Sequence, residues 1–548
     1  MLCTLSLNVA VVWIFDNGGS HCWRKQTSGR QPLGTTINTM RQLTSLDALF
    51  LAMENDRTQG HVSVLGVFDA QTASGRPLDA ALVRELVAAR MHLLPTFRWR
   101  LAPVPFGLDN PYWVDDGTFD VEYHVQDAAL PAPGTQRQLA DVVAHLIGRR
   151  LDRARPLWEL YVIQGLQDGS VAVLTKMHHA AVDGVSGAEV LSVLLDDTAT
   201  GRDLEAAPAV VAERFPSEVE MLGRGLVGMW RQPLRALKAA PTTLPHLDDV
   251  ATLGHVPGVK AIARSSRLVK RALPMRNGGP ALEGNDLVAP QTRFQTRVSA
   301  HRRVAFGTMS LDDVKMVKNT FGCTVNDVVV AICAAGLRSW LDERGELPAG
   351  PLLGFIPVSV RTPEQMGTFG NRVSVMIAEL PTDVADPVQR LRRINETMKA
   401  AKDRHRALPA SLMQDASHFI PPALLAQAGR ATSRLAGIRG INQPVNVGIS
   451  NVPGSPTPLY LGGARQRAQF PISAVLDGIG LNITVFSYQD SLEFGIVVDR
   501  EQLDDPWPLL DALRVGLDEL RDLAKVHASH PPATSTRQKA STRRKATP

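Results

Sequence analysis

Apolar and polar positions follow two different periods along the first half of the chain, where order begins near Met40. In two stretches, residues 78–91 and 136–151, apolar residues recur every three or four positions, which is typical of helices that cover a core. Short aliphatic runs around them predict β-strands at residues 62–68, 160–163 and 170–179. Helices and strands mixed in this way predict an α/β sandwich.

The second half shows the same mixture of periods from about Val304 onward. Residues 310–319 and 325–342 have helical spacing, and Thr324 with Asp327 forms a capping box at the start of the second helix. Five strand-like runs follow, at residues 353–360, 372–380, 445–450, 481–488 and 492–499. The chain is therefore expected to be an α/β protein with one sandwich in each half.

Composition and pattern divide the chain into five segments. They are an extension at 1–39 with little periodicity, an N-terminal domain at 40–200, a basic linker at 201–300, a C-terminal domain at 301–525 and a disordered basic tail at 526–548. The apolar run at residues 2–15 is too short to span a bilayer, and no basic residues precede it as in a signal peptide. This pattern favours a cytoplasmic protein.

The formal net charge of +5 is concentrated at the two ends of the chain. Because residues 1–39 contribute +2 and the tail contributes +5, the body between them carries a net charge of −2. A nearly neutral body argues against specific nucleic-acid binding despite the high pI. The four cysteines, Cys3, Cys22, Cys323 and Cys333, have no spacing that suggests disulfides or zinc, and the last two are expected in one apolar helix.

The linker contains two stretches, residues 221–237 and 259–273, in which apolar residues lie among arginines and lysines. Basic amphipathic helices of this kind can lie on a lipid surface. They can equally pack against both domains with their charges in water. Both interpretations remain open, and the first predicts peripheral contact with a membrane or a lipid droplet.

The strongest chemical signal is a pair of histidines, His178 and His179, followed by Asp183 and Gly184. Successive side chains of a strand point to opposite faces, so the two histidines are expected to have different roles. A neutral imidazole can accept the proton of an alcohol at physiological pH. His179 is the candidate general base, and His178 is expected to support it by packing or hydrogen bonding.

A series of motifs in a fixed order resembles one bacterial family. They are residues 43–47 (Leu-Thr-Ser-Leu-Asp), 156–159 (Pro-Leu-Trp-Glu), 178–184, 326–327 (Asn-Asp), 357–361 (Pro-Val-Ser-Val-Arg), 370–371 (Gly-Asn), 450–454 (Ser-Asn-Val-Pro-Gly), 480–482 (Gly-Leu-Asn) and 487–488 (Ser-Tyr). The chain is similar over roughly residues 40–525 to the wax ester synthase/diacylglycerol acyltransferase family. This family belongs to a superfamily with chloramphenicol acetyltransferase and peptide-synthetase condensation domains. Such proteins typically begin near Met40, so residues 1–39 are expected to be disordered or to follow from a start codon placed too early.

The resemblance implies two chloramphenicol-acetyltransferase-like α/β sandwiches joined by a crossover linker, with the active-site channel between them. It also implies that Asp183 is architectural and pairs with an arginine, for which Arg98 and Arg100 are candidates. Gly184 is expected where a side chain would obstruct the backbone. The remaining candidates come from the second half and are Asn326, Asp327, Ser450 and Asn451.

These four residues have two interpretations each. Asn326 either donates to the oxyanion formed when the thioester is attacked or occupies the first helical turn, and Asp327 is expected to be structural. Ser450 and Asn451 either line the same channel or form a turn after a strand.

The family's chemistry is transfer of a long-chain acyl group from acyl-CoA to diacylglycerol or to a long-chain alcohol. Acyl-CoA is then a co-substrate, and no cofactor or metal is expected. Alternative acceptors are a polyketide or another secondary alcohol, and the non-enzymatic alternative is a lipid-body surface protein. A zinc enzyme is disfavoured because no third ligand is suitably spaced, and a serine hydrolase because no Gly-x-Ser-x-Gly motif occurs.

Overall fold

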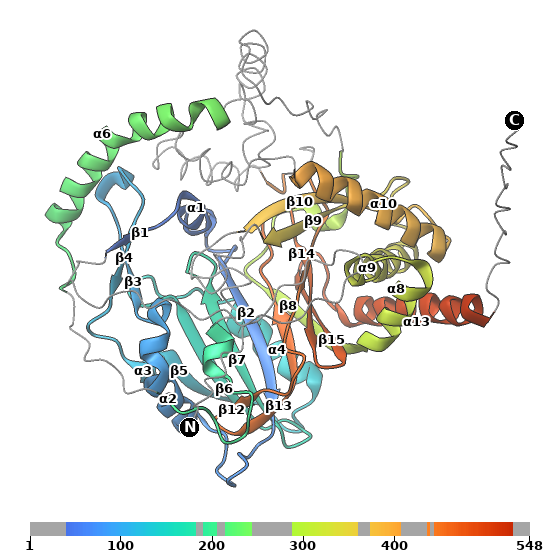
Figure 1. Ribbon diagram of the computed structural model, residues 1–548, viewed down its shortest axis with the longest axis horizontal. Helices are drawn as coiled ribbons and strands as arrows, with labels where there is room; N and C mark the ends of the chain where they lie inside the picture. The colour runs from blue at the N-terminus through green and yellow to red at the C-terminus, as the bar shows by residue number, and fades with distance from the viewer. Residues whose placement is uncertain are drawn as a thin grey trace, which may run out of the picture.

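The computed structural model describes residues 40–181, 190–204, 214–243, 288–359, 373–406, 436–438 and 443–529. Within these residues the chain forms two large mixed sheets with helices packed on them (Figure 1). The α/β class expected from the sequence is confirmed. The second linker stretch, residues 259–273, and the tail beyond Ser529 lie outside the described residues.

The first sheet joins strands in the order β12-β13-β2-β7-β6-β5. Their bounds are β2 (His61–Phe68), β5 (Val125–Ala129), β6 (Trp158–Gln164), β7 (Val171–His178), β12 (Tyr460–Leu461) and β13 (Ala464–Ile472). β2 and β7 pair antiparallel, with His61 opposite His178 at one end of the pair. A smaller sheet of β1 (Arg41–Gln42), β4 (Tyr112–Asp115) and β3 (Trp99–Ala102) lies beside it.

The second sheet has the order β10-β9-β11-β14-β15-β8. Its strands are β8 (Arg302–Ser310), β9 (Leu352–Ser359), β10 (Val373–Leu380), β11 (Val447–Val452), β14 (Leu481–Tyr488) and β15 (Ser491–Asp499). All five strand-like runs of the second half are confirmed to within a few residues. β11 pairs parallel to both β9 and β14, whereas the other pairs of this sheet are antiparallel.

Of the nine helices whose bounds follow, five were predicted from apolar spacing, whereas four, among them those at 387–406 and 507–529, were not. The helices in the described residues are α1 (Ser45–Met53), α2 (Ala80–Arg90), α3 (Val121–His124), α4 (Gln136–Ile147), α6 (Glu218–Thr243), α8 (Leu311–Phe321), α9 (Val325–Asp342), α10 (Pro387–Arg406) and α13 (Trp507–Ser529). α9 begins at its predicted capping box, in which Thr324 and Asp327 bond each other's backbone. α13 continues four residues beyond the predicted domain end at 525.

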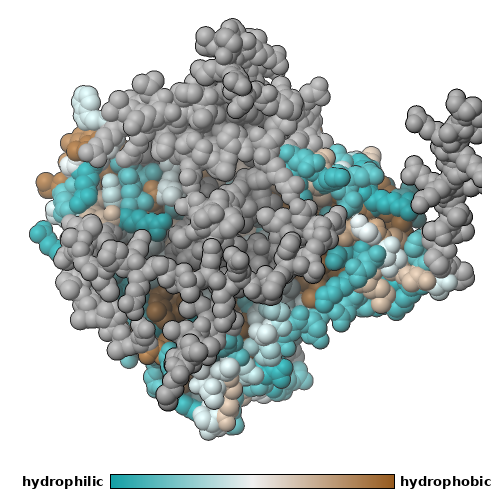
Figure 2. Space-filling view, in the orientation of Figure 1, coloured by the Kyte–Doolittle hydropathy of each residue, from teal (hydrophilic) through white to brown (hydrophobic). Residues whose placement is uncertain are grey.

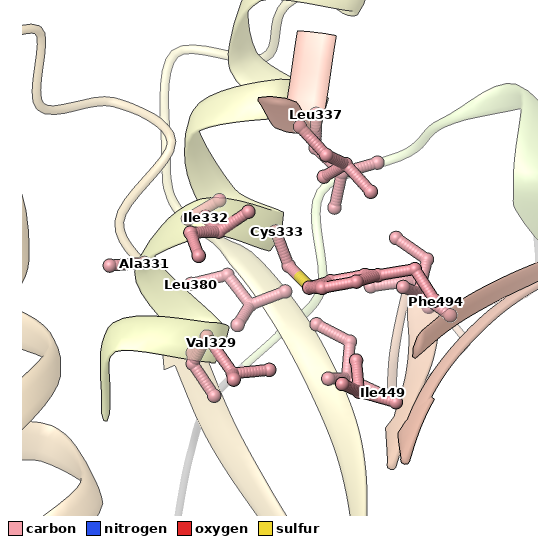
Figure 3. Close-up of a cluster of buried hydrophobic side chains, with 14 of the residues drawn as sticks. Val329, Ala331, Ile332, Cys333, Leu337, Leu380, Ile449 and Phe494 are labelled. Carbon is pink, nitrogen blue, oxygen red and sulfur yellow. The ribbon is translucent and has the colours of Figure 1, made fainter. Parts of the chain in front are cut away.

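The core of the second half is built around α9, whose apolar side chains pack on the sheet (Figure 3). Val329, Ile332 and Cys333 of this helix meet Ile449 of β11 and Phe494 of β15. Burial raises the pKa of the Cys333 thiol to about 12. The expectation that Cys323 shares this helix is wrong, because Cys323 lies in the turn between α8 and α9.

The two halves of the chain share one sheet, which the predicted boundary at residue 300 does not anticipate. β12 and β13 belong to the second half of the sequence, yet β13 pairs along β2, from Gln466 opposite Phe68 to Ile472 opposite Ser63. The α4 helix lies between the halves, where its apolar side chains contact Val304 and Phe306 of β8. The predicted boundary at residue 300 therefore divides the sequence, but it does not divide the structure into two separate sheets, because β12 and β13 belong to the sheet of the first half.

Candidate active site

The two histidines lie where β7 ends, in contact with the segment that connects α1 to β2. His178 is the last residue of the strand, and its backbone N–H donates to the carbonyl of Leu157 (2.9 Å). The strand ends one residue earlier than predicted, so His179 lies in the turn. The N–H of His179 donates to the carbonyl of Gly60 (2.8 Å). The connecting segment 54–60 therefore fixes the backbone at the histidine pair.

His178 is a buried and neutral residue. Its side chain is 1% exposed, and burial lowers its pKa to about 4, although the nearby Glu54 carboxylate opposes this shift. Nδ1 accepts the N–H of Ala180 (3.0 Å), so the ring proton must reside on Nε2. Nε2 points toward Oε1 of Glu54 at 3.7 Å. These contacts suit a support role rather than proton exchange with a substrate.

His179 occupies a different environment, because it lies in the turn that follows β7 and not in the strand as predicted. It is half-buried, and its ring stacks on the ring of Phe50 from α1 with a centroid distance of 4.2 Å and an interplanar angle of 16°. Stacking orients the imidazole without sealing it in the core. Of the two histidines, His179 is the more exposed.

Glu54 is a buried acid at this site that sequence reasoning missed. Its side chain is 2% exposed, and Oε1 accepts the N–H of Gly60 (3.2 Å) while Oε2 accepts from Nη2 of Arg153 (2.6 Å). The ion pair offsets part of the cost of burying this carboxylate next to His178. No local pattern marks Glu54, because its partners come from residues 60, 153 and 178 and meet only in the fold.

Gly60 is required by the close approach of His178. A Cβ atom at this position would lie 2.6 Å from Nε2 of His178 and 2.9 Å from its Cε1. Such distances are shorter than van der Waals contact, so only glycine fits without displacing the ring.

Asp183 and Gly184 lie outside the described residues, so their predicted roles stay predictions. The proposed arginine partners of Asp183 have other carboxylate neighbours in the described part of the structure. Arg98 forms an ion pair with Asp115, and Nη1 of Arg100 lies 3.8 Å from Oδ1 of Asp116.

A second group of polar candidates gathers at the start of α9 and the end of β11. Nδ2 of Asn451 lies 3.5 Å from Oδ1 of Asn326, so residues 125 positions apart are brought together, and both are half-buried, as is Ser450. Asp327 caps α9 and also accepts from Nδ2 of Asn395 (2.8 Å). This geometry gives Asp327 a structural task and leaves Asn326 beside the amide of Asn451.

Among the described residues, no group of three or more histidine, cysteine, aspartate or glutamate side chains is arranged to hold a metal ion. Burial raises the pKa of the Cys323 thiol to about 11, which makes it a poor nucleophile near neutral pH. No single helix in this part of the chain is long and apolar enough to cross a bilayer, although α8 and α9 together satisfy the same criteria as a pair bent by 104°.

Comparisons with solved structures define the class of fold. The chain superimposes on a wax ester synthase/diacylglycerol acyltransferase from Marinobacter aquaeolei VT8 with a TM-score of 0.61 and 29% identity, covering 89% of this chain and 100% of that one. The epimerization domain of tyrocidine synthetase B matches with a TM-score of 0.50 at 13% identity, covering 91% and 100% of the two chains, which shows the fold alone. The two-sandwich fold expected from the sequence is confirmed.

Sequence comparisons narrow the class to one family. Residues 43–329 match the wax ester synthase/diacylglycerol acyltransferase catalytic domain, and residues 369–521 match the C-terminal domain of the same family. A putative diacylglycerol O-acyltransferase of Mycobacterium tuberculosis is 35% identical over 497 residues, which is 89% of this chain and 92% of the relative. A second from the same organism is 35% identical over 487 residues, covering 87% and 99%. The chain belongs to the wax ester synthase/diacylglycerol acyltransferase family and is an acyltransferase of that type.

Proposed function

We propose that this enzyme transfers a long-chain acyl group from acyl-CoA to the free hydroxyl of diacylglycerol, with His179 as the general base. The observation that carries the proposal is the half-buried His179 ring beside the buried, neutral His178, in a chain whose two halves both match the family. A base that must meet a substrate hydroxyl needs this kind of access. Long-chain alcohols are the second class of acceptor and would give wax esters.

The proposed reaction needs no covalent enzyme intermediate. The unprotonated ring nitrogen of His179 takes the hydroxyl proton as the acceptor oxygen attacks the thioester carbonyl carbon. The C–S bond then breaks, CoA leaves as a thiolate, and the proton on His179 returns to the sulfur. The side chain of Asn326, held beside Asn451, is the proposed donor to the oxyanion. Acyl-CoA acts as a co-substrate, and the proposal involves no cofactor or metal.

A panel of acceptors tests the proposed substrates. Purified full-length protein is mixed with palmitoyl-CoA and with diacylglycerol, monoacylglycerol or hexadecanol, and free CoA thiol and acylated product are measured together. We expect the fastest release with diacylglycerol and slower release with hexadecanol. Activity confined to a polyketide or another secondary alcohol would replace the proposed acceptor. Product formation with none of them would favour a non-catalytic lipid-body protein.

We also propose that α6 makes the enzyme's contact with a lipid surface. One face of this helix packs on the N-terminal half, where Met221 is buried and Gly225 lies against Val104 and Leu108. A Cβ at Gly225 would lie 2.6 Å from Cγ1 of Val104, so this face is closely packed. The inner side of α6 is therefore occupied by protein.

The outer face of α6 carries apolar side chains that nothing in the described structure covers. Val219, Leu226 and Trp230 recur at intervals of seven and four, on one helical face, and Trp230 is 79% exposed. Beside the helix, Phe106 is 85% exposed at a turn with a left-handed backbone (φ 59°). Figure 2 shows apolar residues among hydrophilic ones along the edge where α6 lies.

The charge of the helix favours an anionic lipid surface as its partner. Its sequence holds two acids, Glu218 and Glu220, and four bases, Arg224, Arg231, Arg235 and Lys238. An amphipathic helix with an aromatic residue on its apolar face and excess positive charge binds at the headgroup boundary.

Vesicle binding tests this surface. Changing Phe106 and Trp230 together to glutamate should weaken binding to phosphatidylcholine vesicles containing phosphatidylglycerol by at least about tenfold, because each buried aromatic stabilises the bound state by about 1.5–3 kcal/mol. Val515→Glu, on the exposed face of α13, is the matched control and should bind as the unchanged protein does. Equal binding by the double variant and the control would contradict the assignment to α6.

A further inference from the structure

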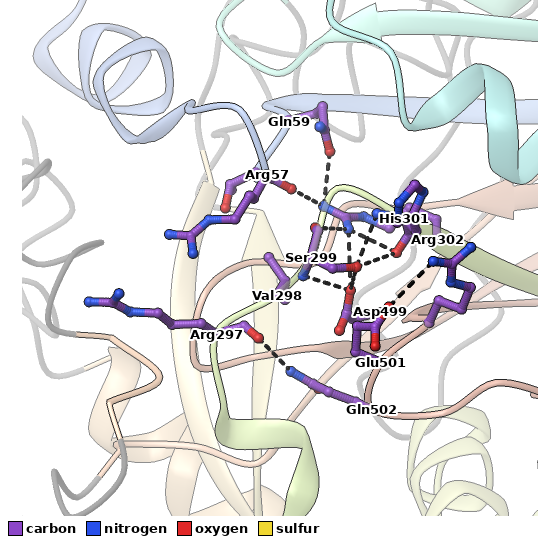
Figure 4. Close-up of polar contacts among 12 residues, drawn as sticks. Arg57, Gln59, Arg297, Val298, Ser299, His301, Arg302, Asp499, Glu501 and Gln502 are labelled. Atoms are coloured by element: carbon purple, nitrogen blue, oxygen red, sulfur yellow. Dashed lines mark hydrogen bonds and ion pairs between the residues drawn. The ribbon is translucent and has the colours of Figure 1, made fainter.

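A buried arginine, Arg302, is bonded to groups from both halves of the protein (Figure 4). Arg302, the first residue of β8, has a side chain that is 3% exposed and lies 3.7 Å from Oδ1 of Asp499. Burial lowers the pKa of Arg302 to about 10, so its guanidinium remains charged at neutral pH. A cation this deep in the protein requires well-placed acceptors on every side.

The C-terminal half supplies one set of these acceptors. Nη1 of Arg302 donates to the carbonyl of Ser299 (2.7 Å). The hydroxyl and the N–H of Ser299 both donate to Oδ1 of Asp499, at 2.5 and 2.8 Å. Arg302 and Asp499 are thus held on the C-terminal side by the backbone that leads into β8.

The N-terminal half supplies the other set, all from the segment that holds the histidines. Nη2 of Arg302 donates to Oε1 of Gln59 (2.9 Å) and to the carbonyl of Arg57. The Arg57 side chain in turn lies 3.7 Å from Asp477 of the C-terminal half. Segment 54–60 is therefore fixed to the C-terminal half by several charged or hydrogen-bonded contacts.

The same segment sets the position of His179. Gln59, which binds Arg302, is followed directly by Gly60, whose carbonyl accepts the N–H of His179 and whose N–H donates to Glu54. Because Gly60 is bonded through both its N–H and its carbonyl, a shift of this residue would disturb both Glu54 and His179. Only one peptide bond separates the residue held by Arg302 from the residue that holds His179.

We propose that Gln59 and Arg302 are positioning residues that fix the His179 backbone relative to the C-terminal half of the protein. The cluster forms only when both halves are docked, because its acceptors come from both. His179 is then placed correctly only when the two halves are docked. The catalytic part of this inference rests on the proposed role of His179, whereas the structural part does not.

Gln59→Ala tests the inference without leaving Asp499 deprived of its cation. We expect faster hydrogen–deuterium exchange of the His179 amide and a fall in kcat of about tenfold or more, because small misplacements of a reacting group are costly. The KM for acyl-CoA should change by less than about twofold, because no substrate contact is removed. Gln59→Glu keeps an acceptor for Arg302 and should restore both slow exchange and most of kcat.

Arg303→Met is the matched control. Arg303 is the neighbour of Arg302 on β8, and its Nη1 forms an exposed ion pair with Asp141 of α4 (3.2 Å), so it also joins the two halves. Exposed pairs of this kind contribute little, so exchange at His179 and kcat should remain unchanged.

Three results would overturn the inference. One is unchanged exchange at His179 in Gln59→Ala, and another is faster exchange without loss of kcat. The third is equal effects of Gln59→Ala and Arg303→Met. If His179 is not the base, His179→Ala will retain activity, and the exchange measurement still decides whether Gln59 positions this backbone.

Discussion

Replacing His179 with alanine should lower kcat/KM by about 10²–10⁴-fold, because general-base catalysis contributes a factor of this size. The variant should fold normally, since the ring is half-buried and its stacking on Phe50 contributes about 0.5–1.5 kcal/mol at most. Turnover is measured as CoA release with diacylglycerol, and folding as the thermal unfolding midpoint. Unchanged turnover would remove His179 as the base.

Two other histidines, His178 and His527, show whether the loss of activity is specific to His179. Because the pKa of His178 is lowered to about 4 by burial, that ring stays neutral across the range in which a typical histidine titrates. His178 is therefore not expected to contribute an acid limb to the pH dependence of kcat/KM near neutrality. His527→Ala, at the exposed end of α13, should leave turnover unchanged.

Gly60→Ala is expected to have the next largest effect. The new Cβ would lie 2.6 Å from Nε2 of His178, whose side chain is buried. Either the ring moves and loses its bond with the Ala180 N–H, or the Gly60 carbonyl moves and releases His179. We expect a loss of about 1–3 kcal/mol in the free energy of unfolding, as for other overpacked sites, and a fall in turnover of about 100-fold.

Denaturant unfolding and CoA release measure these two effects separately. Gly350→Ala is the matched control, because a Cβ there would meet no heavy atom within 4 Å and the backbone is not left-handed. It should change stability by less than about 0.5 kcal/mol. A Gly60→Ala protein as stable and as active as the unchanged chain would show that segment 54–60 tolerates the shift.

Local signals in the sequence predicted the elements that have their own cap or aliphatic run, whereas β8, α10 and α13 were not predicted. The capping box at Thr324 and the aliphatic runs of β14 and β15 express their structure within a few residues. β13 was not predicted, since its sequence Ala-Arg-Gln-Arg-Ala-Gln-Phe-Pro-Ile carries four long polar side chains in its first six positions. Its identity as a strand depends on β2, almost 400 residues earlier in the chain.

The residues of the candidate site also fall into two groups, those that a local sequence pattern marks and those that it does not. His178 and His179 form a contiguous motif, so sequence reasoning found them and assigned them different environments. Glu54, Gln59 and Arg302 escaped notice because each is an ordinary polar residue in its local context. Gln59 and Arg302 are 243 positions apart and acquire a role only when β8 and segment 54–60 meet.

The pairing of β13 with β2 has a further consequence for how the chain can be divided. A fragment ending at residue 300 would lack β12 and β13 and would expose the backbone amides and carbonyls of β2 along a free edge. Free edges recruit strands from other molecules, so such a fragment would be prone to self-association. The N-terminal module of the sequence is thus completed by strands that come more than 150 residues after its predicted end.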